Sequence, residues 1–133
     1  MTSTSRTSRA LLDTSVFIAR ESARRIGRIP DESTVSVVTL AELHLGVLMA
    51  ETRNIRAVRL RTLTSVQSLF EPLPIDQEVA RTFAEIVADS RQKGRKPKIM
   101  DTWIAATAVA HGLTLHTQDE GFLSLPRVRV TLV

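Results

Sequence analysis

Four acidic residues of this chain stand where apolar runs end or where helix-period segments begin. Asp13 closes one apolar run, Glu42 lies early in a helical segment, and Asp101 opens another. Asp119 follows a later apolar run. In a parallel α/β sheet, the carboxyl ends of the strands and the helix starts after them line one edge. We therefore expect the four carboxylates to converge.

Carboxylates that share a site repel one another unless cations hold them together. Oxygen ligands suit Mg²⁺ or Mn²⁺, and zinc is disfavoured because the chain has no cysteine. Helical spacing aligns Glu42 with Leu45, Gly46 and Met49, so its side chain is expected to lie along the apolar face of the helix. The four acids therefore predict a divalent-metal site.

Each acid also fits an ordinary structural role. Thr39 and Glu42 have the spacing of a capping box. Asp13 and Asp101 suit helix starts, and Asp119 suits a turn. Taken singly, each residue is more often structural than functional, and their joint placement at one edge is what favours a site.

Polar neighbours of these acids give weaker indications. The hydroxyls of Thr14, Ser15 and Thr117 are placed to bond a carboxylate, although local bonding at a helix start or turn fits them equally well. The histidines lack metal-ligand spacing and are interpreted as structural. No glycine-rich phosphate loop is present, which disfavours ATP and NAD.

The elements that must position the acids follow an α/β pattern, with short apolar runs between segments of helical period. The predicted strands cover residues 10–12, 35–38, 72–75, 113–116 and 128–133. The predicted helices include residues 54–70, 76–92 and 102–111. This alternation predicts an α/β domain with a largely parallel sheet.

The length of 133 residues fits one domain, which we expect over residues 9–133 after a loose polar tail at residues 1–8. The absence of cysteine excludes a disulfide-stapled secreted scaffold and fits a reducing cytoplasm. No apolar run approaches the ~20 residues of a membrane helix, so no membrane association is expected.

Basic residues number 18 against 14 acids, and 15 of them are arginine, whose planar fork suits phosphate. Residues 91–98 carry five basic side chains just before Asp101, so this loop should border the site and could follow an RNA backbone. A second basic group is expected on the helix after Asp13, where it would face RNA or a partner protein. Its members are Arg20, Arg24, Arg25 and Arg28.

Three segments, residues 11–18, 36–46 and 101–115, together resemble the PIN-domain ribonucleases, and within them the VapC-type toxins. The resemblance implies a three-layer α/β/α fold with a central parallel sheet. Matching positions make Asp13, Glu42 and Asp101 metal ligands. In the family, a fourth motif often ends with an acid just before a Phe. In this chain Gly121 precedes Phe122, so Asp119 is expected to supply the fourth carboxylate alone.

The resemblance further implies an Mg²⁺- or Mn²⁺-dependent endoribonuclease, the toxin of a type II toxin–antitoxin pair. Its partners would be an RNA substrate, a VapB-like antitoxin and a second copy of the chain in a homodimer. If the four acids form one pocket, ten other acids face 18 bases, which leaves +8 for a surface suited to a polyanion.

Three other functions could use a chain of this type. A receiver-type phosphoryl-transfer domain needs paired acids after its first strand, whereas Asp13 stands alone. A haloacid-type phosphatase needs Asp-x-Asp, which Ser15 breaks. The third, a catalytically silent RNA- or partner-binding module on the same fold, is left open by the sequence.

Overall fold

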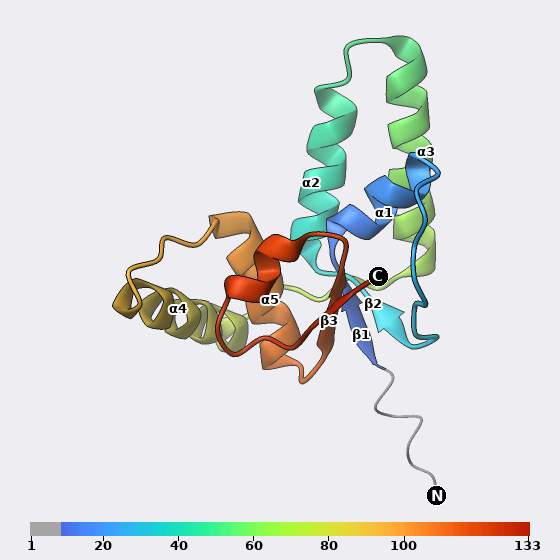
Figure 1. Ribbon diagram of the computed structural model, residues 1–133. Helices are drawn as coiled ribbons and strands as arrows, with labels where there is room; N and C mark the ends of the chain where they lie inside the picture. The colour runs from blue at the N-terminus through green and yellow to red at the C-terminus, as the bar shows by residue number, and fades with distance from the viewer. Residues whose placement is uncertain (1–8) are drawn as a thin grey trace, which may run out of the picture.

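The computed structural model describes residues 9–133, so the predicted tail at residues 1–8 lies outside the described residues. Its centre is a four-stranded parallel sheet with the strand order β2-β1-β3-β4 (Figure 1). The strands are β1 (Ala10–Leu12), β2 (Ser33–Thr34), β3 (Thr114–Thr117) and β4 (Val130–Leu132).

Helices lie on both sides of this sheet. They are α1 (Thr14–Glu21), α2 (Val37–Leu48), α3 (Arg53–Leu69), α4 (Gln77–Gln92) and α5 (Ile99–Ala110), with a short 3₁₀ helix, η2 (Glu120–Ser124). Figure 1 shows α2 and α3 as an antiparallel pair projecting from one side, while α4 and α5 pack together on the other. No helix within residues 9–133 combines the length and apolar character needed to cross a membrane.

Strand β1 separates two hydrophobic clusters, because alternate residues of a strand point to opposite faces. Leu11 is fully buried and packs with residues of α4, α5 and β3. Ala10 and Leu12 instead pack with residues of α1, α2 and α3. The predicted three-layer α/β/α fold with a central parallel sheet is therefore confirmed. One domain over residues 9–133 stays a prediction.

Most of the predicted elements are confirmed within a few residues of their ends. The prediction of a strand at residues 35–38 is wrong, because the strand β2 covers the preceding residues Ser33–Thr34 and Val37 already begins α2. The Ser36 hydroxyl caps this helix by accepting from the Val38 N–H at 3.0 Å. The run at 72–75 contributes a single bridge, from Leu73 to Ser36.

Three positions predicted near helix starts also need correction. Thr39 is not a cap, and Glu42 lies in the second turn of α2, because the helix begins at Val37. Asp101 is the third residue of α5 rather than the residue before it. The second basic group is divided, since α1 ends at Glu21 and only Arg20 of that group lies on it.

Candidate active site

One cleft of about 470 Å³ is lined by all four of the predicted acids. Asp13 follows β1, Glu42 lies on α2, Asp101 lies in the first turn of α5, and Asp119 precedes η2. Exposed apolar side chains, those of Ile18, Leu45 and Met49, line the cleft beside them. The topology thus brings together residues that lie far apart along the chain.

Asp13 is fixed by both backbone and side-chain contacts, and only 4 % of it is exposed. Its N–H donates to the carbonyl of His116 at 2.9 Å, which ties the end of β1 to β3. Its Oδ2 accepts from the Thr117 hydroxyl at 2.8 Å and from the Ser15 N–H at 3.3 Å. The second contact makes Asp13 the N-cap of α1.

The directions of these hydrogen bonds follow from counting protons. Thr117 has a single hydroxyl proton, which goes to Asp13. In its 3.1 Å contact with Ser15 Oγ, the Ser15 hydroxyl must therefore be the donor. The N–H of Gln118 donates to Ser15 Oγ, and that of Asp119 donates to Thr117 Oγ1, both at 2.9 Å. This network holds the Asp13 carboxylate in one orientation.

Glu42 is held by Thr14, whose hydroxyl lies 2.6 Å from Glu42 Oε1 and 2.9 Å from Thr39 Oγ1. Burial raises the pKa of Glu42, and the charge of Asp13 raises it further, while the hydrogen bond from Thr14 opposes the rise. Glu42 therefore binds a proton more readily than an exposed glutamate does.

The negative charges of the other three acids act on Asp101. Its pKa rises from 3.8 to about 6, first through burial and then through the negative charges of Asp13, Asp119 and Glu42. The ammonium of Lys98 lowers the pKa and so opposes this rise. Like-charge repulsion of this kind shows that the cleft concentrates negative charge, which a bound cation would neutralise.

Asp119 is more exposed than the other three acids and caps η2, where its Oδ1 accepts from the Gly121 N–H at 2.8 Å. A Cβ at Gly121 would lie 3.0 Å from the same oxygen. A larger residue at position 121 would therefore have to move the Asp119 carboxylate by a few tenths of an ångström.

The donor set suits a hard divalent cation, since four carboxylates and no thiol face the cleft. Within residues 9–133, however, no three acidic or histidine side chains lie at the mutual distances of an ion's ligands. Uncompensated carboxylates repel one another, and Asp101 and Asp119 have room to turn. Metal binding would therefore require side-chain rotation.

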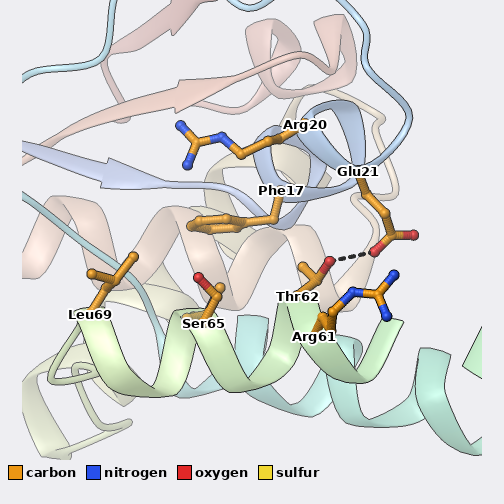
Figure 2. Close-up of a pocket in the computed structure, with 8 residues that line it drawn as sticks. Phe17, Arg20, Glu21, Arg61, Thr62, Ser65 and Leu69 are labelled. Atoms are coloured by element: carbon orange, nitrogen blue, oxygen red, sulfur yellow. Dashed lines mark hydrogen bonds between the residues drawn. The ribbon is translucent and has the colours of Figure 1, made fainter. Parts of the chain in front are cut away.

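A second hollow, of about 300 Å³, lies between α1 and α3 and has a different character (Figure 2). Its wall carries Phe17, with Arg20 and Arg61 among the other lining residues. The only acid in its lining, Glu21, already accepts a hydrogen bond from Thr62 at 2.7 Å. This hollow has no cluster of acids with which to carry out metal-dependent chemistry.

Thr14 and Thr117 were not predicted as site residues, since local bonding explained their positions equally well. The structure shows long-range bonds instead, spanning 28 residues from Thr14 to Glu42 and 104 from Thr117 to Asp13. Thr14 and Thr117 each lie next to a strand end and close to an acid in the sequence, which indicates a role near the site. This position does not identify the distant residue that each one bonds.

Comparison with known proteins shows which protein family this chain resembles. The model of the PIN domain matches residues 10–128. Ribonuclease VapC5 of Mycobacterium tuberculosis strain H37Rv is 49% identical over 117 residues, covering 86% of each chain. Ribonuclease VapC4 of the same strain is 46% identical over 130 residues, covering 94% of this chain and 97% of its own.

A solved structure is also similar, that of VapBC-5 from Mycobacterium tuberculosis, a member of the VapBC family of toxin–antitoxin systems. It superposes with a TM-score of 0.82 at 44% identity, over 95% of this chain and 98% of the other. The similarity thus extends over nearly the whole fold and includes the strands and helices that carry the four acids.

Proposed function

The chain belongs to the PIN-domain family, and from this membership we propose that it is a divalent-metal-dependent endoribonuclease, the toxin of a type II toxin–antitoxin pair. The observation that carries the proposal is the single cleft lined by Asp13, Glu42, Asp101 and Asp119. Two relatives of similar sequence are named ribonucleases, which supports the same reaction.

Asp13, Glu42, Asp101 and Asp119 are the residues that would hold Mg²⁺ or Mn²⁺. When bound between carboxylates, such ions activate a water molecule near neutral pH and neutralise charge on the phosphoryl oxygens. The raised pKa of Asp101 supports this assignment, because burial and the charges of three neighbouring acids together outweigh the opposing charge of Lys98.

The residues of the cleft differ in what they contribute. Asp13 is buried and held by Thr117, so it would supply a fixed oxygen ligand for the metal ion. Glu42 is held by Thr14 on the facing helix. Asp119 is exposed, which suits a residue that orients the attacking water. Hydrolysis then forms a bond from the water oxygen to phosphorus as the bond to the leaving ribose oxygen breaks.

The partners we propose are an RNA substrate, a VapB-like antitoxin and a second copy of this chain. The antitoxin is supported by the similarity to a structure from a toxin–antitoxin system. The surplus of basic residues outside the cleft supports RNA. A cytoplasmic location is part of the same proposal, since cellular RNA is found there.

A cleavage assay with a fluorogenic RNA tests the function. We expect cleavage with Mg²⁺ or Mn²⁺, none with EDTA, and recovery when the metal is restored. Cleavage that continues in EDTA would contradict the metal mechanism. RNA binding without cleavage in any divalent metal would instead favour the silent binding module.

A further inference from the structure

A third hollow, of about 210 Å³, adjoins the carboxylate cleft and shares Asp101 with it. One wall comes from the loop between α4 and α5, and the other from η2 and the residue after it. Its lining consists of Lys96, Pro97, Lys98, Asp101, Gly121, Ser124 and Leu125. A polymer leaving the cleft past Asp101 would enter this hollow.

The two walls are fastened together by groups other than the lysines. The loop leaves α4 through Gly94, whose φ of +73° reverses the chain direction. Arg95 then donates its N–H to the Ser90 carbonyl and its Nη1 to the Ser124 carbonyl, each at 2.9 Å. The Ser124 hydroxyl donates to the Gly121 carbonyl at 3.0 Å. Lys96 and Lys98 are thus presented by an anchored loop.

The charge of this hollow is the reverse of that in the cleft. Lys96 and Lys98 are exposed, and in the part of the chain that the structure describes neither forms an ion pair. Asp101 is the only acid in the lining. On the opposite wall, the residues that line the hollow, Gly121, Ser124 and Leu125, carry no charge.

We propose that this hollow holds the RNA phosphate next to the one that is cleaved, with Lys96 and Lys98 as its ligands. The inference rests on the proposed ribonuclease function, which puts the scissile phosphate at Asp101. Two ammonium groups on an anchored loop neutralise a backbone phosphate without reading the base. RNA is favoured over an acidic protein segment, because the hollow continues the cleft in which the scissile phosphate would lie.

The test is binding of a labelled single-stranded RNA in EDTA, followed by fluorescence anisotropy across a salt series. We expect Lys96→Gln with Lys98→Gln to weaken binding roughly tenfold at low salt and to reduce the salt slope by about 0.7, the contribution of the one phosphate that both lysines hold. Arg61→Gln is the matched control, because it removes an exposed cation from the hollow in Figure 2. It should leave the slope unchanged.

Each result has a distinct meaning. If the double variant binds and cleaves RNA as the unaltered chain does, the subsite is wrong while the ribonuclease stands. If the unaltered chain cleaves no RNA but binding depends on both lysines, the proposed function fails, while the hollow still binds an RNA phosphate. If the lysines affect binding of the antitoxin but not of RNA, the hollow docks protein and the proposal is overturned.

Discussion

The hydroxyl of Thr117 donates a 2.8 Å hydrogen bond to Oδ2 of Asp13, across 104 residues of sequence. Thr117 is completely buried at the end of β3, and Asp13 follows the neighbouring strand β1. Because β1 and β3 pair, Thr117 lies beside Asp13, and its hydrogen bond fixes the orientation of the Asp13 carboxylate.

Thr117→Val should disturb that orientation. The N–H of Asp119 loses its buried acceptor, which costs about 1–3 kcal/mol of unfolding free energy. Cleavage should fall roughly tenfold or more, because a displaced carboxylate would no longer hold the metal ion in the position that the reaction needs. Urea unfolding and the kcat on a fluorogenic RNA measure the two effects.

Two further variants separate orientation from general destabilisation. Thr117→Ser keeps the hydroxyl and should restore most of the activity. Thr107→Val removes a hydroxyl that is equally buried but bonds only the Trp103 carbonyl of its own helix. If Thr107→Val reduces kcat as much as Thr117→Val does, the role of the bond to Asp13 is refuted.

Asp13→Asn should abolish cleavage while the chain still folds. Asparagine caps helices about as well as aspartate, so the start of α1 is retained. Asp76→Asn makes the same change at the N-cap of α4, away from the cleft, and should leave activity unchanged. Near-normal cleavage by Asp13→Asn, measured beside this control, would show that Asp13 is not a ligand.

Asp101→Asn should stabilise the metal-free chain. The pKa of Asp101 rises from 3.8 to about 6 on folding, so between these values the folded state keeps a proton that the unfolded state has lost. Stability therefore falls as pH increases through this window. Removing the charge should recover about 1 kcal/mol above the window, allowing for solvent screening of a half-buried group.

Thermal unfolding in EDTA at about pH 4 and about pH 7.5 measures this gain. It should be present at the higher pH and absent at the lower one. The exposed Asp31→Asn serves as a control outside the cleft and should not reproduce it. An equal gain at both pH values would contradict the electrostatic origin.

Mg²⁺ or Mn²⁺ should raise the melting temperature of the unaltered chain, because a ligand that binds only the folded state stabilises it. The expected gain is about 2.7 kcal/mol at 100 times the dissociation constant. Asp13→Asn should lose most of this response, whereas Asp76→Asn should keep it. An equal response in all three proteins would place metal binding outside the cleft.

Gly121→Asp should strengthen metal binding by adding a fifth carboxylate close to Asp119. The new Cβ lies 3.0 Å from Asp119 Oδ1, a side-chain oxygen that can move. Gly121→Asn provides nearly the same shape without the charge and should leave metal affinity unchanged. Calorimetric titration with Mn²⁺ compares them, and equal affinity for both variants would show that position 121 does not face the metal.

The sequence was sufficient for the α/β layers and for the four acids, because apolar periodicity and acids at strand ends are local patterns. It was misleading at residues 35–38, where β-branched residues favoured a strand. There the Ser36 cap begins a helix packed against the sheet, and this tertiary packing outweighs local propensity. The roles of Thr14 and Thr117 depend on partners 28 and 104 residues away, which no local pattern identifies.

The pairing of β1 with β3 also determines when during synthesis the protein can become active. Asp13 is synthesised 104 residues before its orienting partner Thr117. A nascent chain released or stalled before Thr117 lacks both β3 and Asp119. Products that stop before Thr117 should therefore lack nuclease activity, which would appear only after Thr117 and Asp119 have been synthesised.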